Sequence, residues 1–355
     1  QGGRISTSGD QHFAELVVLD KTDTTTDVIT TLTSTNGKVT FDAAIHNAQS
    51  TAPQSLTVVA ANDVLFSGEV GEASSALGDV VINTPAVTTF AKSVDAASLK
   101  TDVAGSGITA GLIGNKVIIH GGSITTSGDQ RFAELVVLDK TDTTTDVITT
   151  LTSTAGKVTF DAAIHNAQSN SPQSLTVVAA NDVLFSGEVG QASSALGDVV
   201  INTPAVTTFA KSVDAATLKT DVGGVTASAS VNKVVIQGGS ITTSGDQHFA
   251  ELVVLDKTDV SIDVITTLTS TAGKVTFDAA IHNAQSTAPQ SLTVVAANDV
   301  LFSGEVGEAT SALGDVVINT PAVTTFAKSV DAATLKTDVG GVTASASVNK
   351  VVIQG

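Results

Sequence analysis

Three aspartates lie close together in the segment DKTDTTTD, and their type and spacing suggest a ligand for a cation. Asp20, Asp23 and Asp27 fall within residues 20–27, and the third copy of the segment, DKTDVSID at 256–263, keeps all three carboxylates. Clustered carboxylates are typical of sites for hard cations such as Ca²⁺. The spacing matches neither an EF-hand loop nor a glycine-rich nonapeptide repeat. We therefore interpret the segment as a polar turn, keep Ca²⁺ binding as the alternative, and predict no metal-binding residues.

Histidine recurs at two positions that could hold a metal ion. The first is the motif AIHNAQ, and the second precedes a phenylalanine and carries arginine in one copy: His46, His165 and His282, then His12, Arg131 and His248. A guanidinium has no free acceptor with which to bind a metal, so the second position is not a ligand site. The chain has no HExxH motif and no paired histidines at ligand spacing. We interpret these histidines as surface or turn residues.

The sequence predicts no catalytic residues and no cofactor-binding residues. Serine and threonine are abundant, but no GxSxG motif is present. An enzyme that cleaves acidic polysaccharide needs an acidic cluster, often with an arginine or lysine base, at one place on its fold. Arg4 and Arg131 are the only arginines, and the other copies of the repeat carry neither. We predict that the protein is not an enzyme, with a β-helix polysaccharide enzyme as the alternative.

A binding face is the other alternative class. Glycan sites commonly use Trp or Tyr, and the chain contains neither. Ice binding needs a regular threonine array, but the runs TTLTST (30–35, 149–154) and PAVTTF (85–90) do not place threonine at one constant position. Threonine is also a good strand former. An adhesive or ice-binding face therefore stays an alternative, and the sequence identifies no host or surface ligand.

Composition and charge exclude several partners. The 355 residues include 17 basic and 35 acidic side chains, for a net charge of −18. Nucleic-acid binding needs a basic surface, so we predict no nucleic-acid partner. The chain has no cysteine, which excludes disulfides and thiolate metal sites. No apolar run approaches the roughly 18 residues of a membrane helix, so we predict no membrane insertion.

Three nearly identical repeat units fill the chain. We place them at residues 1–119, 120–236 and 237–355, where the last two residues begin a fourth unit, and we expect one continuous domain. All twelve phenylalanines recur at equivalent places, at 13, 41, 66 and 90 in the first unit. Because the step to the next unit is roughly twice as long as the others, one phenylalanine is missing per unit. Each unit then contains about five sub-repeats.

The sub-repeats have the pattern of short strands. Segments such as SLTVV (55–59) and DVVIN (79–83) are rich in Val, Leu and Thr and are separated by turn residues. A period of about 24 residues with several short strands fits one coil of a β-solenoid. We predict an all-β solenoid of about fifteen coils, with parallel ladders spaced by ~4.8 Å and equivalent residues stacked in a narrow core.

The repeat resembles a known family of bacterial surface proteins. GGSITTSGDQRFAELVVL (121–138), followed by LTSTAGKVTFDAAI (151–164), is similar to the tandem repeats of large exoproteins of the filamentous-haemagglutinin-like adhesin type. The family often has Tyr where this chain has Phe. The resemblance implies a right-handed parallel β-helix, a secreted or cell-surface location, and a stalk or fibre role, and it transfers no catalytic residues.

The two ends of the chain repeat the sequence of an internal junction. VVIQGGSITTSGDQHF at 234–249 is matched by VVIQG at 351–355 and by QGGRISTSGDQHF at 1–13. A heterologous contact that does not close makes an open filament. We expect a structural protein of an extracellular bacterial filament or adhesin stalk. Its partner is itself, head to tail, or adjoining repeats of the same array.

Overall fold

The protein folds entirely into β-strands in the residues that its structure, a computed structural model, describes. These residues are 3–20, 28–48, 52–102, 114–139, 148–167, 171–222, 232–257, 264–284, 288–339 and 348–354. No helix among them could cross a membrane. The chain divides into two compact units, Gln1–Asn181 and Asp182–Gly355. This division falls inside the second predicted repeat unit rather than at a repeat boundary.

The first compact unit contains nineteen described strands of three to eight residues. They are β1 (Arg4–Thr7), β2 (Gln11–Phe13), β3 (Val17–Leu19), β4 (Thr30–Ser34), β5 (Val39–Phe41), β6 (Ile45–Asn47), β7 (Leu56–Ala60), β8 (Val64–Phe66), β9 (Leu77–Asn83), β10 (Val87–Phe90), β11 (Val94–Thr101), β12 (Lys116–Ile119), β13 (Ser123–Thr126), β14 (Gln130–Phe132), β15 (Leu135–Leu138), β16 (Thr149–Ser153), β17 (Val158–Phe160), β18 (Ile164–Asn166) and β19 (Leu175–Ala179).

The second compact unit contains seventeen described strands of the same kind. They are β20 (Val183–Phe185), β21 (Leu196–Asn202), β22 (Val206–Phe209), β23 (Val213–Thr220), β24 (Lys233–Ile236), β25 (Ser240–Thr243), β26 (Gln247–Phe249), β27 (Leu252–Leu255), β28 (Thr266–Ser270), β29 (Val275–Phe277), β30 (Ile281–Asn283), β31 (Leu292–Ala296), β32 (Val300–Phe302), β33 (Leu313–Asn319), β34 (Val323–Phe326), β35 (Ala332–Thr337) and β36 (Lys350–Ile353).

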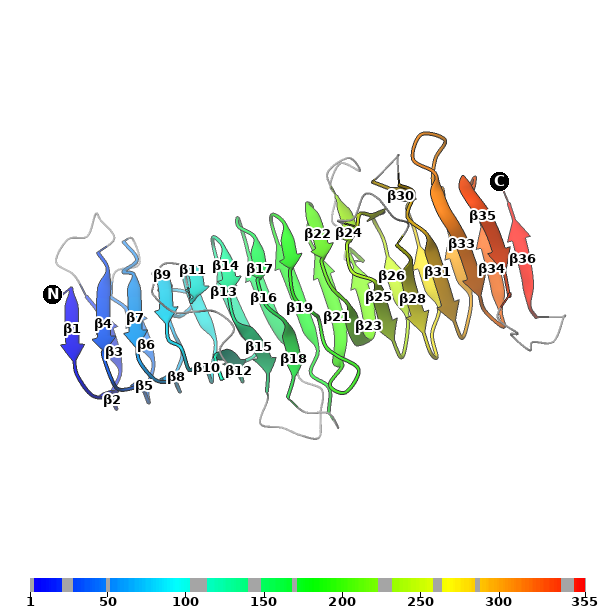
Figure 1. Cartoon of the computed structure of the whole chain (residues 1–355). Helices are drawn as coiled ribbons and strands as arrows, with labels where there is room; N and C mark the ends of the chain where they lie inside the picture. Colours follow the sequence, from blue (N-terminus) through cyan, green and yellow to red (C-terminus); the bar gives the residue numbers. More distant parts are fainter. Residues whose placement is uncertain are drawn as a thin grey trace. The chain divides into compact units, whose positions relative to one another are not determined.

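Parallel pairing between successive coils builds a β-solenoid, which confirms the predicted class of fold. At the N-terminal end of the first unit, β1 pairs with β4, and β4 pairs with β7 (Figure 1). Beside them, β2 pairs with β5 and β3 pairs with β6, so three ladders form three walls around one interior. Each coil buries its apolar face only by stacking on its neighbours, as expected for a solenoid.

Alternation along each strand explains why these segments become walls. In β4, residues 30, 32 and 34 are buried while Thr31 and Thr33 are half-buried, and β7 repeats this pattern one coil later. Successive side chains of a strand point to opposite faces, so Leu32 and Val58 fill the interior while Thr31 and Thr57 face outward. Threonine and valine are both favourable on a pleated surface of this kind. The alternation of residue types along each strand therefore determines which face of the strand points into the core.

Phenylalanines form stacked columns in the core. Phe13, Phe41 and Phe66 stack with ring centroids 5.0 and 5.1 Å apart, and Phe90 follows at 5.3 Å. Adjacent strands in a sheet are about 4.8 Å apart, so each ring rests on the ring of the previous coil. In the second unit, Phe249, Phe277, Phe302 and Phe326 form the same kind of column. The predicted stacking of Phe on Phe is confirmed within a repeat.

Between repeats, the ladders change position, and this corrects the predicted number of coils. Phe90 pairs with Ile119, and Ile119 then pairs with Leu138 instead of with Phe132, the next residue of the phenylalanine series. Phe132 instead pairs with Thr101, on the ladder that began at Ile5. Each repeat therefore contributes one strand fewer than five full coils of three walls would need. The solenoid has fewer coils than the fifteen predicted.

The length of a coil also varies, whereas the sequence predicts about 24 residues throughout. Along the ladder that begins at Ile5, one coil takes 24 residues, from Val58 to Ile82. The next takes 19, from Ile82 to Thr101, and the one after takes 31, from Thr101 to Phe132. The short and the long coil adjoin each other at the boundary between repeats. Turns of different length absorb this difference without changing the strand pairing.

Candidate functional site: coil edges and repeat junctions

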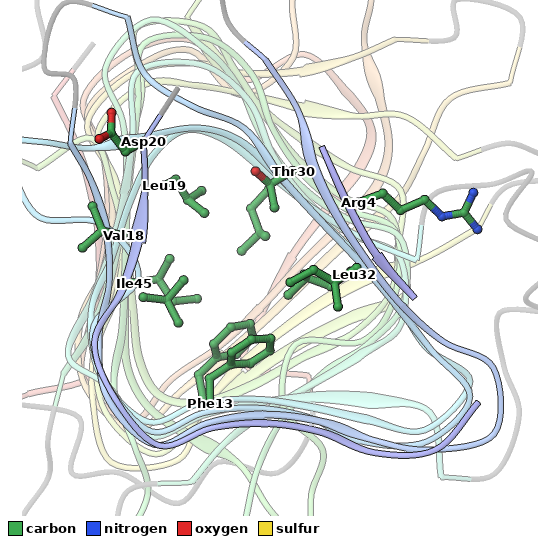
Figure 2. A pocket seen from close by; sticks show the side chains of 12 residues that line it. Arg4, Phe13, Val18, Leu19, Asp20, Thr30, Leu32 and Ile45 are labelled. Atoms are coloured by element: carbon green, nitrogen blue, oxygen red, sulfur yellow. The ribbon is translucent and has the colours of Figure 1, made fainter. Parts of the chain in front are cut away.

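The N-terminal coil presents an open edge to solvent. Strand β1 pairs with β4 only, among the residues that the structure describes. Ile5 of this strand is 44% exposed, whereas its copies Ile124 and Ile241 are 0% exposed. Beside it, Phe13, Leu19 and other core side chains line a cavity of ≈ 260 Å³. Figure 2 shows these side chains pointing into the interior, with Arg4 directed away from it.

The last described coil presents a second open edge. Strands β35 and β36 pair with β33 and β34, respectively, and within the described ranges neither has a partner on its other side. Leu335 is 45% exposed and Ile353 is 78% exposed. The internal copies of these two residues, Leu218 and Ile236, are 0% and 1% exposed. The same residue types are thus solvent-facing at the edge and fully packed inside.

An internal repeat junction shows what normally covers such an edge. In the second unit, β23 pairs with β25 and β26, and β24 pairs with β27. By sequence, β24 is the copy of the exposed β36, while β25, β26 and β27 are copies of β1, β2 and β3. The register joins Leu218 to Gln247 and Ile236 to Leu255. The two open edges are therefore the two halves of a junction that the chain already forms internally.

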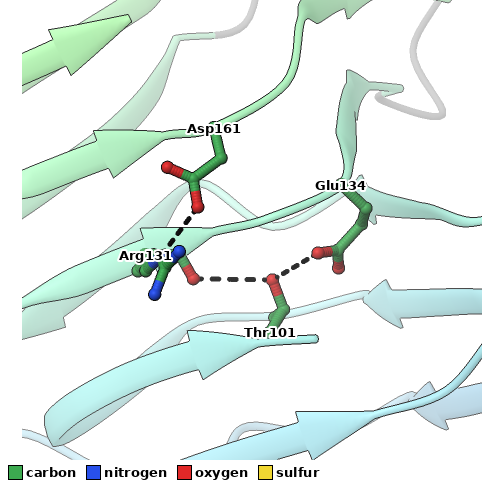
Figure 3. A network of polar contacts seen from close by, with 4 residues as sticks. All are labelled: Thr101, Arg131, Glu134 and Asp161. Atoms are coloured by element: carbon green, nitrogen blue, oxygen red, sulfur yellow. Dashed lines mark hydrogen bonds and ion pairs between the residues drawn. The ribbon is translucent and has the colours of Figure 1, made fainter. Parts of the chain in front are cut away.

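Each junction also buries two carboxyl groups. Glu134 is 2% exposed, and its Oε2 accepts a hydrogen bond of 2.9 Å from the Thr101 hydroxyl. In Figure 3 the same hydroxyl also reaches the backbone oxygen of Arg131. The neighbouring Asp102 is buried too, and its Oδ1 accepts a hydrogen bond of 2.9 Å from the backbone N–H of Thr84. Oε1 of Glu134 and Oδ2 of Asp102 have no hydrogen-bond partner among the described residues.

The electrostatics of this pair favour a proton on Glu134. Burial raises the pKa of Glu134 to about 8, and the charge of Asp102 adds to the rise, while the hydrogen bond from Thr101 opposes it. Burial also raises the pKa of Asp102, although the hydrogen bond from the backbone N–H of Thr84 and the nearby amide of Asn115 oppose this rise. Two carboxylates in a desolvated site cannot both ionise without a large penalty. At neutral pH the junction therefore favours the protonated form of Glu134.

Backbone geometry places Asp102 at the junction. Its φ is 50°, in the left-handed region that Asp and Asn tolerate better than most residues. Asp221 and Asp338, the copies in the other repeats, have φ values of 51° and 56°. The second junction repeats the cluster, since Thr220 donates to Glu251 over 3.0 Å and burial raises the pKa of Glu251 to about 8. The local turn is thus encoded in each repeat.

At the coil edges, the two halves of this cluster are separate. Glu15, the first-repeat copy of Glu134, is exposed, and Asp338, the third-repeat copy of Asp102, is half-buried. The buried carboxyl cluster could not be predicted from the sequence, because Thr101 and Glu134 are 33 residues apart and neither belongs to a motif. The signal that could have found it is a glutamate in every copy of the apolar segment FAELVVL.

The side chain at the recurring position of His12, Arg131 and His248 contacts an aspartate of the adjacent coil. His12 lies 2.6 Å from Asp42, Arg131 lies 2.7 Å from Asp161, and His248 lies 2.7 Å from Asp278. Both side chains of each pair are at least partly exposed. The prediction of a surface position is therefore confirmed, and ion pairing explains why arginine can replace histidine there. Surface pairs of this kind contribute about 0–1 kcal/mol each.

The candidate Ca²⁺ segment is only partly visible. Asp20 is exposed at the end of the first coil, while Asp23 and Asp27 lie outside the described residues. In the third copy, Asp256 is described and the two following aspartates are not. The histidines of the AIHNAQ motif lie on β6, β18 and β30, where each is half-buried.

Comparison with protein-family models, curated proteins and solved structures finds no match to this chain.

Proposed function

We propose that this chain is a structural repeat protein whose open coil edges associate end to end, with a second copy head to tail or with adjoining repeats of one array. The observation that carries the proposal is the difference in solvent exposure between residues at the coil edges and their copies inside the solenoid. Ile5, Leu335 and Ile353 are exposed at the edges, whereas their internal copies are buried against strands of the neighbouring repeat. Edge strands with unpaired backbone groups are templates for further pairing.

The internal junction supplies the register of the proposed contact. Transferred to the edges, it pairs Ile353 with Leu19 and Leu335 with Gln11 of the next copy. It also places Asp338 beside Glu15, which completes a third buried carboxyl cluster. This contact joins two different surfaces, and we propose that it continues the stacking of the coils and so gives an open filament. The backbone pairing adds hydrogen bonds and the apolar residues add burial at the same interface.

The resemblance to filamentous-haemagglutinin-like repeats supports the biological setting that we propose. We infer an extracellular or cell-surface fibre, or an adhesin stalk, of bacterial origin, in which the protein acts mechanically and not as an enzyme. We also expect a right-handed coil, the hand strongly preferred for parallel crossover connections. Continuous ladders and a dry core would give the fibre its stiffness.

A substitution at one edge tests the proposal. Ile353→Asp places a charge where the contact would bury it without a partner, which is strongly unfavourable. We expect the parent chain to form concentration-dependent oligomers in sedimentation experiments and the variant to stay monomeric. Ile148→Asp is the matched control, because Ile148 is also an exposed isoleucine but lies in the interior of the repeat array. Equal assembly of all three proteins would overturn the proposed edge contact.

A further inference from the structure

A histidine and two glutamates gather on adjacent coils of the third repeat, away from the edges and junctions. The ligand atoms of His282, Glu305 and Glu308 all lie within 4.8 Å of one another. Nδ1 of His282 is 3.7 Å from Oε1 of Glu308. His282 and Glu308 are partly buried, while Glu305 is exposed. The three side chains are therefore partly held in place by packing and remain accessible to water.

The fold brings these residues together through a tight turn in the next coil. His282 lies in β30, and the neighbouring Ile281 pairs with Val306, which lies between the two glutamates in sequence. Gly307 follows with a φ of +73°, and a Cβ at this position would lie 2.1 Å from the backbone oxygen of Asp331. Only glycine fits such a turn. The turn places Glu305 and Glu308 on either side of the bridge to β30.

The donor set suits a transition-metal ion. One imidazole nitrogen and two carboxylate oxygens are ligands that Zn²⁺ accepts, and a partly exposed site leaves room for water as the fourth ligand. The Ser311 hydroxyl donates a hydrogen bond of 3.0 Å to Oε1 of Glu308 and so helps to orient it. Hydrogen bonds of this kind position metal ligands in many sites.

The other two repeats provide a comparison within the same chain. The first repeat carries the same three residues, His46, Glu69 and Glu72, and Ser75 donates to Glu72 over 3.0 Å. Burial raises the pKa of the neighbouring Asp95, and the charges of Glu69 and Glu72 add to this effect. Negative charge is thus crowded at this position. The second repeat keeps His165 and Glu188 but has Gln191 in place of the second glutamate.

We propose that His282, Glu305 and Glu308 bind a divalent transition-metal ion of the Zn²⁺ type and thereby link two adjacent coils. We extend the proposal to the same three residues of the first repeat on sequence grounds, although only the third-repeat set is gathered within 4.8 Å among the described residues. Gln191 removes one anionic ligand, so the second repeat lacks the site. The ion offsets the negative charge of the crowded carboxylates.

Counting bound zinc in paired variants tests this assignment. The untagged full chain is dialysed against Zn²⁺ alone, and the bound metal is measured per chain. Glu308→Gln gives the third repeat the residue of the second, and we expect it to lose one bound Zn²⁺ relative to the parent. Gln191→Glu completes the set in the second repeat, and we expect it to gain one. Both substitutions are at partly exposed positions, so the fold is retained.

A control and a second readout keep the result specific to the site. Glu188→Gln changes the second repeat, where the set is already incomplete, and should leave the bound zinc unchanged. In NMR spectra of the parent, Zn²⁺ should shift the imidazole resonances of His282, and the Glu308→Gln variant should lose this shift. The proposal is overturned if Glu308→Gln binds as much zinc as the parent, or if Gln191→Glu gains none.

Discussion

At the scale of single residues, the buried carboxyl pair at each repeat junction is the most unusual feature of the chain. Glu134 and Asp102 each have one oxygen that accepts a hydrogen bond and one without a hydrogen-bond partner among the described residues. A proton on Glu134 allows this side chain to donate a hydrogen bond as well as accept one. The same arrangement recurs at Glu251 and Asp221. Protonation is therefore part of how one repeat packs on the next.

This pair makes the stability of the fold depend on pH. Burial raises the pKa of Glu134 to about 8 in the folded chain, from 4.5 for a glutamate exposed to water in the unfolded chain. Between these values the folded state binds more protons, so the free energy of unfolding falls as pH rises from about 4.5 to 8 and then levels off. Each unit of pKa difference corresponds to about 1.4 kcal/mol, so a few kcal/mol are at stake per junction.

Glu134→Gln should remove much of this dependence, because a neutral amide replaces the protonated acid. We expect the variant to resemble the parent at pH 4 to 5 and to be more stable than it at pH 9, as measured by urea unfolding. Glu15→Gln is the matched control, since this copy is exposed at the coil edge and should change little at either pH. A stability difference between Glu134→Gln and the parent that is the same at both pH values would contradict the account.

At the scale of strands and coils, the phenylalanine columns hold the core in register. Phe277 is 1% exposed and stacks on Phe249 and Phe302 at 5.2 and 5.1 Å. Phe277→Ala leaves a cavity that rigid strand ladders cannot close, and we expect it to cost about 3–5 kcal/mol. The half-buried Phe13 of the edge coil has one stacking partner in the described structure, so Phe13→Ala should cost clearly less. Chemical denaturation of both variants compares them, and equal losses would argue against the columns.

The element scale also shows what the sequence could and could not predict. The recurrence of Phe13, Phe41, Phe66 and Phe90 predicted the stacked columns, because equivalent positions of a regular coil must lie above one another. The pairing of Phe90 with Ile119 and of Thr101 with Phe132 was not predictable in the same way. The sequence repeats after a whole unit, but the coils do not complete a whole number of turns in that unit. Only the strand register shows which wall each residue reaches.

The same distinction, between what a sequence pattern predicts and what only the strand register shows, applies to the site residues. His12, Arg131 and His248 were predicted as surface positions from the exchange of residue types, but their aspartate partners come from the next coil and have no local signal. Glu134 and Thr101 meet for the same reason. Contacts within a strand follow from local patterning, whereas contacts between coils depend on turn lengths that the sequence does not state.

At the scale of the whole molecule, the proposed end-to-end association can be weighed against the charge of the chain. The chain has a net charge of −18, so copies repel one another over a distance set by ionic strength. Side-by-side contact of similar acidic walls is disfavoured, whereas the coil edges combine apolar residues with unpaired strands. This balance predicts growth along one direction, and salt that screens the repulsion should promote it.

Electron microscopy of the 355-residue chain over a concentration series, in buffer of moderate salt, tests the central claim most directly. The account predicts unbranched filaments of uniform width that lengthen as concentration rises and that are absent for Ile353→Asp. Discrete particles of one size at every concentration, identical for the parent and the variant, would contradict it.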